Sequence, residues 1–214
     1  MGTMRSDLNE ATALAQRLRP AISDMRALAA IASIPRALFV PERERDRAYE
    51  NIALPIACGQ TISQPLVVAR MIEVVAPRAS DRVLDVGTGS GYHAALLALL
   101  AEHVWTIERH PTLSAAAQRA IAELGLDNLT FVVGDGSQGL PDEAPFDAIN
   151  VAAATGDSVP TVLERQLAEG GRLVAPVGAA SQHLMLTRRT ANGFEREQLE
   201  AVRFVPLVRG DRER

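Results

Sequence analysis

Hydrophobic residues recur at helical spacing in the first third of the chain. Leu8–Leu18 carries them along one face, and Pro20 ends the helix that this pattern predicts. Ser23–Ala32 predicts a second helix with a polar cap at its start, and Pro65–Val75 predicts a third. Between the second and third helices, Pro41–Asn51 is dense in Glu and Arg, which is typical of a solvated connecting segment.

From Arg82 onward, short apolar runs alternate with helix-length segments. The expected strands are Val83–Val86, Val104–Ile107, Leu129–Val133, Phe146–Val151 and Arg172–Val177. The expected helices between them are Ala94–Leu100, Leu113–Leu124 and Val159–Leu167. Strands that are joined by helices form right-handed βαβ units, so this part of the chain predicts a parallel sheet with both faces covered.

The end of the chain has a different pattern. His183–Arg189 and Val202–Pro206 alternate apolar and polar residues across Asn192-Gly193, which indicates an antiparallel hairpin. We therefore expect a doubly wound, mostly parallel α/β sheet with a helical N-terminal segment and a C-terminal hairpin. Residues 1–78 are expected to cover an active site, and residues 79–214 to form the ligand-binding core in one compact unit.

Composition narrows the classes of protein that fit. The 214 residues are 47% hydrophobic, which is enough for a sizeable core. A net charge of -4 argues against a nucleic-acid binder, and no apolar run approaches the ~18 residues that a membrane span needs. The single Cys58 cannot form an internal disulfide, which favours location in a reducing cytoplasm. We expect Cys58 to be a small side chain packed inside the protein.

A glycine-rich loop follows the first predicted strand of the sheet. Its glycines are Gly87, Gly89 and Gly91, at relative positions 1, 3 and 5, whereas a dinucleotide fingerprint has them at 1, 3 and 6. The Gly-Lys-Ser/Thr ending of a phosphate-binding P-loop is also missing. Asp85 followed by Gly-x-Gly-x-Gly resembles the loop of S-adenosylmethionine (AdoMet)-dependent methyltransferases, although a plain strand-to-helix turn would have the same glycines.

Acidic residues also end the next two strands, where ligands bind in open parallel sheets. Glu108 lies 21 positions after Gly87, close to the ~20-residue offset at which an acid meets a ribose diol. Asp135, followed by Gly136, is placed to accept a hydrogen bond from an exocyclic amine such as that of adenine. The expected cofactor-binding residues are Asp85, Gly87, Thr88, Gly89, Gly91, Glu108, Asp135 and Gly136.

The resemblance becomes more specific outside the loop. Several segments outside the loop, together with it, resemble the protein-L-isoaspartate (D-aspartate) O-methyltransferase family, with matches from about residue 17 to 208. These segments are Leu54-Pro55-Ile56, Gly59-Gln60-Thr61-Ile62-Ser63-Gln64-Pro65, Phe39-Val40-Pro41, Ala48-Tyr49 and Phe204-Val205-Pro206-Leu207. The resemblance implies an AdoMet-dependent enzyme that methylates the carboxylate of isoaspartyl residues in damaged proteins and peptides. The ester then cyclises to a succinimide, part of which reopens to normal aspartate.

The family's active-site serine corresponds to Ser63, whose hydroxyl is expected to hold the acceptor carboxylate in line. Thr61 and Ile62 are expected to line the same substrate site. Ser63 is also a good N-cap for the helix that starts at Pro65, and both roles can coexist because a helix N-terminus favours an anion.

The chemistry of this reaction makes few demands on the protein. A carboxylate is already ionised at neutral pH, so the nucleophile needs no general base, and alignment and desolvation are expected to carry the acceleration. The four histidines do not cluster in sequence, and no His/Cys/Asp/Glu set has convincing metal spacing, so we expect no metal cofactor.

Two departures from the family pattern keep alternatives open. The loop Ala152–Pro160 is longer and more polar than is usual, and Ala57 stands where Gly is common. The alternatives are methylation of a normal aspartate in one dedicated peptide, and a non-catalytic AdoMet-binding module. The sequence leaves the oligomeric state open, with a monomer favoured, and favours a cytoplasmic protein that binds neither nucleic acid nor membrane.

Overall fold

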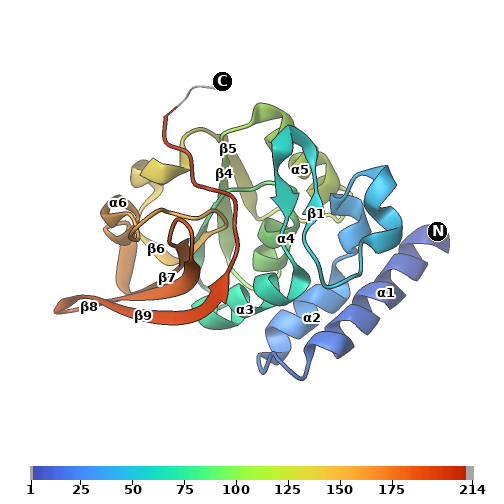
Figure 1. The fold of residues 1–214 in the computed structure, drawn as a ribbon, viewed down its shortest axis with the longest axis horizontal. Coiled ribbons are helices and arrows are strands. Elements are labelled where there is room, and N and C mark those ends of the chain that lie inside the picture. The colour runs from blue at the N-terminus through green and yellow to red at the C-terminus, as the bar shows by residue number, and fades with distance from the viewer. Residues whose placement is uncertain (1, 211–214) are drawn as a thin grey trace.

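A seven-stranded β-sheet forms the centre of the structure, a computed structural model that describes residues 2–210 (Figure 1). The strands are β3 (Arg82–Val86), β4 (His103–Glu108), β5 (Leu129–Val133), β6 (Phe146–Val151), β7 (Leu167–Val177), β8 (Gln182–Thr190) and β9 (Gly193–Val202). Their order in the sheet is β5-β4-β3-β6-β7-β8-β9. The first five pair in parallel, and β8 and β9 are antiparallel, which confirms the predicted doubly wound fold with a terminal hairpin.

Helices cover both faces of this sheet (Figure 1). They are α1 (Gly2–Leu18), α2 (Met25–Ser33), α3 (Pro65–Val75), α4 (Tyr92–Ala98), α5 (Pro111–Ala122) and α6 (Thr161–Glu164). One face of the sheet, including Val83 and Val104, shares a core with the first five helices. The other face, including Leu84 and Ile149, packs on Leu163 of α6.

All three predicted N-terminal helices are present, but only α3 has the predicted bounds. Helix α1 begins at Gly2 instead of Leu8, and α2 spans Met25–Ser33 instead of Ser23–Ala32. Asp24 caps α2, because its carboxylate accepts from the backbone N–H of Arg26 at 2.8 Å. Pro65 is the first residue of α3. Between α2 and α3 the chain forms short 3₁₀ turns and a small antiparallel pair, β1 (Leu54–Pro55) with β2 (Thr61–Ile62).

The structure corrects two elements near the end of the chain. The helix expected over Val159–Leu167 is only the four residues of α6, because β7 already begins at Leu167 and passes through Gly170-Gly171 with a register shift against β6. The strand expected at Val202–Pro206 is wrong, since β9 ends at Val202. This strand lies at the sheet edge with most side chains exposed, so apolar alternation does not mark it.

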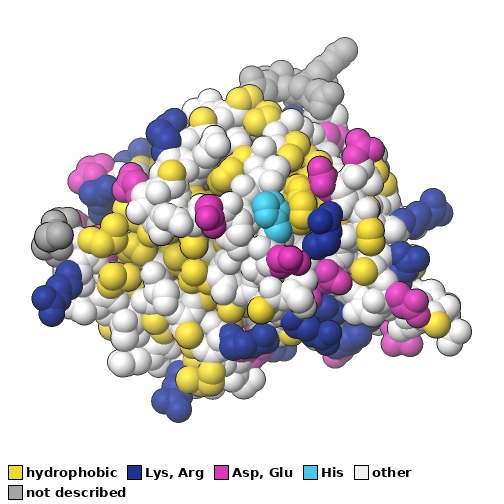
Figure 2. Space-filling model, turned by 180° about the vertical axis from the view of Figure 1, so that it is seen from behind, with side chains coloured by type: hydrophobic (Ala, Val, Ile, Leu, Met, Phe, Trp, Pro, Cys, Tyr) yellow, Lys and Arg dark blue, Asp and Glu magenta, His cyan; other side chains and the backbone are white. Residues whose placement is uncertain are grey.

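The described surface carries charges of both signs. On the face seen in Figure 2, Lys/Arg and Asp/Glu side chains lie interspersed among hydrophobic and neutral ones, with no area of a single sign among the side chains drawn in colour. Over residues 2–210, no helix combines the length and apolar character that crossing a membrane requires.

Candidate active site

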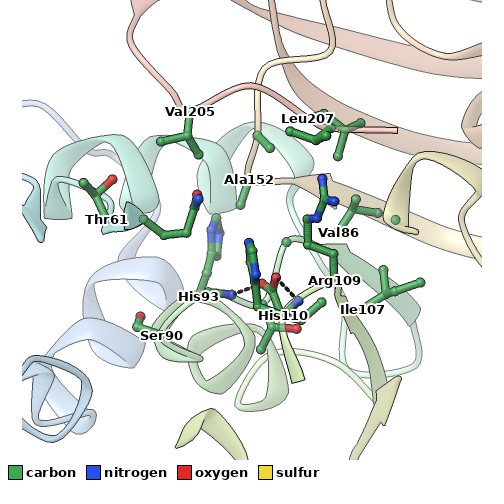
Figure 3. Close-up of a pocket in the computed structure, with 18 of the residues that line it drawn as sticks. Thr61, Val86, Ser90, His93, Ile107, Arg109, His110, Ala152, Val205 and Leu207 are labelled. Carbon is green, nitrogen blue, oxygen red and sulfur yellow. Dashed lines mark hydrogen bonds between the residues drawn. The ribbon is translucent and has the colours of Figure 1, made fainter. Parts of the chain in front are cut away.

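An open cavity of about 1250 Å³ lies at the carboxyl ends of β3, β4 and β6. Its wall combines the glycine loop after β3, the end of β4, Gly136 after β5, and Ala152 after β6. Residues 60–63 close one side, and the C-terminal segment 205–210 crosses another. Figure 3 shows these contributions meeting, with Thr61 and Val205 toward one side and Arg109 and Ile107 toward the other.

The three glycines of the loop adopt backbone conformations that L side chains rarely reach. Their φ angles are +94° at Gly87, +53° at Gly89 and +90° at Gly91. At Gly91 there is also no room, because a Cβ would lie 2.8 Å from Cβ of Ala117 in α5. The loop can therefore run close to a ligand while α4 packs tightly against α5.

Glu108, at the end of β4, presents a fixed carboxylate to the cavity. It is buried, and Oε2 accepts from the backbone N–H of Gly89 at 2.8 Å while Oε1 accepts from that of His110 at 3.0 Å (dashed in Figure 3). Each oxygen keeps further acceptor capacity. Two adjacent acceptors with a fixed orientation suit a ribose diol, as the sequence predicts.

Asp135 is held differently. Its Oδ1 accepts from the backbone N–H of Ser137 at 2.9 Å, and its Oδ2 accepts from that of Gly210 at 2.7 Å. Burial opposes ionisation, but these hydrogen bonds outweigh it and lower the pKa of Asp135. The side chain is not part of the cavity wall, whereas the neighbouring Gly136 is, and a Cβ there would lie 2.7 Å from Cγ1 of Val86. Contact between Asp135 and an adenine amine stays a prediction.

Asp85 is fully buried behind the cavity wall rather than in it. It accepts from Nδ2 of Asn150 at 2.7 Å and from Oγ1 of Thr106 at 2.9 Å. Thr106 in turn bonds the hydroxyl of Thr88 at 2.6 Å, so the Thr88 hydroxyl is engaged inside the protein although Thr88 lines the cavity. Burial raises the pKa of Asp85 to about 6 against the lowering effect of its two donors. Direct ligand contacts of Asp85 and Thr88 stay predictions.

His93 and Asn150 join this network, and sequence reasoning did not identify them as site residues. Nδ2 of Asn150 lies 3.2 Å from Nδ1 of His93, and His93 lines the cavity. Burial lowers the pKa of His93 to about 3, so the imidazole is neutral over the physiological range. The available signal was position, because His93 follows the glycine loop within two residues.

Ser63 lies where the large cavity meets a second one of about 610 Å³. Thr61 lines both cavities as well, while Ile62 is buried and lines only the larger. The prediction that Ser63 caps α3 is wrong, because Oδ1 of Asn51 accepts from the free N–H of Leu66 at 2.9 Å. Among the described residues, the Ser63 hydroxyl has no hydrogen-bond partner, which leaves it available to a substrate.

A buried arginine holds the backbone of Ser63 in place. Arg36 donates to the carbonyl oxygens of Ala48, Ile52 and Ser63, the last at 3.0 Å. Its side chain is completely buried, and burial lowers the pKa of its guanidinium to about 10, which leaves it charged at neutral pH. Sequence reasoning did not single out this residue, since its partners lie up to 27 positions away.

Cys58 corrects one expectation. It is exposed at the cavity mouth instead of packed in the core, and its backbone is left-handed with φ 56° and ψ 27°. The turn over Ala57–Gly59 projects this side chain outward. Within residues 2–210, no group of three or more His, Cys, Asp or Glu side chains is arranged to hold a metal ion.

The chain is similar to known proteins in sequence and in fold. The family model of protein-L-isoaspartate(D-aspartate) O-methyltransferase (PCMT) matches residues 9–212. A protein-L-isoaspartate O-methyltransferase of Aeromonas hydrophila is 50% identical over 198 residues, covering 92% of this chain and 96% of that protein. One of Roseiflexus castenholzii is 52% identical over 194 residues, covering 90% and 88%.

A solved structure of a similar protein has the same fold. A Plasmodium falciparum protein in complex with S-adenosyl-L-homocysteine superposes with a TM-score of 0.80 at 27% identity, covering 92% of this chain and 98% of that one. Together with the family match, this fold and its glycine loop show that the protein is an AdoMet-dependent methyltransferase. Within that class, the chain belongs to the protein-L-isoaspartate(D-aspartate) O-methyltransferase family.

Proposed function

We propose that this protein transfers the methyl group of AdoMet to the free carboxylate of L-isoaspartyl residues in damaged proteins and peptides. The observation that carries the proposal is the position of Ser63, whose hydroxyl has no partner among the described residues and lies where two cavities meet. The larger cavity suits the methyl donor and the smaller one the acceptor chain. The family names of the relatives agree with this acceptor.

The larger cavity fits AdoMet on its own geometry. The fixed oxygens of Glu108 suit the ribose diol, and the backbone of Gly87 and Gly89 lets a ligand lie close. Gly136 keeps its part of the wall free of a side chain. Bound AdoMet supplies a methyl group that passes from its sulfonium sulfur to a carboxylate oxygen, leaving S-adenosylhomocysteine (AdoHcy).

The shared wall favours an acceptor that arrives already ionised. The residues common to both cavities are Thr61, Ser63, Ala152 and Val205, and none of them is a general base. The nearby imidazole of His93 is a weak base because burial lowers its pKa to about 3. A carboxylate needs no proton removed, so the protein has only to orient it and exclude water.

Two peptides that differ only in the linkage of one aspartyl residue test which carboxylate the enzyme methylates. We expect methyl transfer from radiolabelled AdoMet to an L-isoaspartyl peptide to exceed that to the same peptide with normal aspartate by at least about 100-fold, since the extra backbone methylene moves the carboxylate. Equal rates would favour a dedicated aspartyl substrate, and AdoHcy binding without either ester would indicate a binding module. Residues 155–158 line neither cavity, so we expect the polar loop not to reverse the preference.

Ser63→Ala tests the role of the hydroxyl. Because one hydrogen bond to a charged acceptor contributes about 1.5–3 kcal/mol, we expect kcat/KM for the isoaspartyl peptide to fall by about 10- to 100-fold. The AdoHcy dissociation constant should change less than about threefold. Ser33→Ala, which removes an exposed hydroxyl bonded to the carbonyl of Ala29 in α2, is the matched control. Near wild-type turnover of the Ser63 variant would remove the hydroxyl from the mechanism.

The proposal extends to the setting of the enzyme. The single cysteine is consistent with a reducing cytoplasm, and isoaspartyl proteins and peptides are the partners that this chemistry requires. We expect a monomer that is complete as an enzyme. Light scattering during size-exclusion chromatography tests the monomer.

A further inference from the structure

His93 is a buried polar group with one ring nitrogen engaged and the other not. The residue is 8% exposed, lies in the first turn of α4, and lines the large cavity. Nδ1 lies 3.2 Å from Nδ2 of Asn150, while Nε2 is buried without a hydrogen-bond partner among the described residues. In Figure 3 the ring stands in the cavity and is directed toward Ala152. A buried polar atom without a hydrogen-bond partner costs folding free energy, so we expect Nε2 to bond a ligand in the cavity.

The network behind the cavity sets which proton the ring carries. An ionised Asp85 can only accept, so Asn150 must direct its NH₂ group to it, at 2.7 Å. The same NH₂ group faces Nδ1 of His93, which must then be the unprotonated nitrogen of the neutral imidazole. The hydrogen therefore lies on Nε2, and His93 offers a donor.

The donors and acceptors on the two sides of the cavity indicate which ligand group His93 bonds. Glu108, an acceptor, ends β4 on one side of β3, whereas His93 contacts Asn150 of β6 on the other side. The hydroxyls of Thr61 and Ser63 line the same cavity as further possible donors. We propose that Nε2–H of His93 donates a hydrogen bond to a ligand carboxylate, either the α-carboxylate of AdoMet or the isoaspartyl carboxylate. This inference rests on the proposed function, because both carboxylates belong to its substrates.

His93→Leu separates the two sources. If the bond is to the cofactor, the dissociation constant of AdoHcy rises by about 10- to 100-fold, while that of 5′-methylthioadenosine, which lacks the amino-acid carboxylate, is unchanged. If the bond is to the acceptor, AdoHcy affinity is unchanged and KM for the isoaspartyl peptide rises by a similar factor. His93→Gln, which retains an N–H donor, should recover part of either loss. His103→Leu, at the opposite end of β4, is the control.

The wild-type protein gives an independent readout. In ¹⁵N-histidine spectra at pH 7.5, His93 should be the neutral Nε2–H tautomer, and its Nε2 signal should shift on addition of AdoHcy or of the isoaspartyl peptide together with AdoHcy. An Nδ1–H tautomer, or unchanged affinities and KM in a folded His93→Leu variant, overturns the proposal. Failure of wild type to methylate the isoaspartyl peptide would instead overturn the proposed function, and the AdoHcy titrations would still test His93.

Discussion

Replacement of Glu108 by Gln is expected to weaken AdoHcy binding by about 100-fold. The neutral amide keeps only one acceptor oxygen, and losing one charge-assisted hydrogen bond to the ribose costs about 1.5–3 kcal/mol of binding free energy. Both oxygens of Glu108 already accept backbone N–H groups, from Gly89 and His110. The NH₂ group of a glutamine must oppose one of these donors, so the variant loses part of the loop's support as well as its charge. Isothermal titration calorimetry with AdoHcy measures the change.

A deoxyribose analogue separates the ribose contact from the loop. In wild type, 2′-deoxy-AdoHcy should bind about tenfold more weakly than AdoHcy, since one hydroxyl has lost its acceptor. In the Glu108→Gln variant the two ligands should bind about equally, because their difference depends on the missing carboxylate. Glu123→Gln, an exposed change at the end of α5, is the control. The same difference between the two ligands in both proteins would contradict a contact between Glu108 and the ribose.

The central strands of the fold are predictable because their environment is uniform. Strands β3 and β6 are buried on both faces, so each forms a continuous apolar run whose limits the sequence shows within a residue. Strand β9 lies at the edge with most side chains exposed, and its Glu and Arg residues hide the strand period. The end of β7 that contains Gly170-Gly171 was missed because paired glycines indicate a turn, whereas here they form an irregularity against β6.

The candidate site also has residues that the sequence predicts and residues that it does not. Glu108 could be predicted because the end of a parallel strand is a place in the fold that the sequence itself marks. The bond between Asn150 and His93 joins residues 57 positions apart, and that between Asn150 and Asp85 joins residues 65 apart. No local pattern indicates such pairs, and the apolar neighbours of Asn150 indicate an ordinary core strand. Asp85 was recognised from its motif, but its position behind the wall depends on these tertiary partners.

Arg36→Met is expected to have the largest effect on stability. The side chain is fully buried, and its loss leaves the carbonyl oxygens of Ala48, Ile52 and Ser63 without their donor. At about 1–3 kcal/mol for each unsatisfied group, partly relieved by relaxation, the free energy of unfolding should fall by about 4 kcal/mol. This corresponds to a melting temperature lower by about 10 °C for a chain of this size. Calorimetry or circular dichroism measures both quantities.

The same variant should lose activity at temperatures where it remains folded. Arg36 donates to the carbonyl of Ser63 at 3.0 Å, so its removal frees the segment that we propose orients the acceptor, and kcat/KM should fall at least about tenfold. AdoHcy affinity should fall less, because the Glu108 carboxylate and the glycine loop are held by other bonds. Arg43 is exposed and lies 3.7 Å from the largely buried carboxylate of Glu44, so Arg43→Met should change stability by less than about 0.5 kcal/mol. Arg36→Lys keeps the charge but lacks the planar fork that reaches three carbonyls, so its stability and activity should lie between those of Arg36→Met and wild type. Wild-type kcat/KM in a destabilised Arg36→Met protein would show that the arginine supports the fold without positioning Ser63.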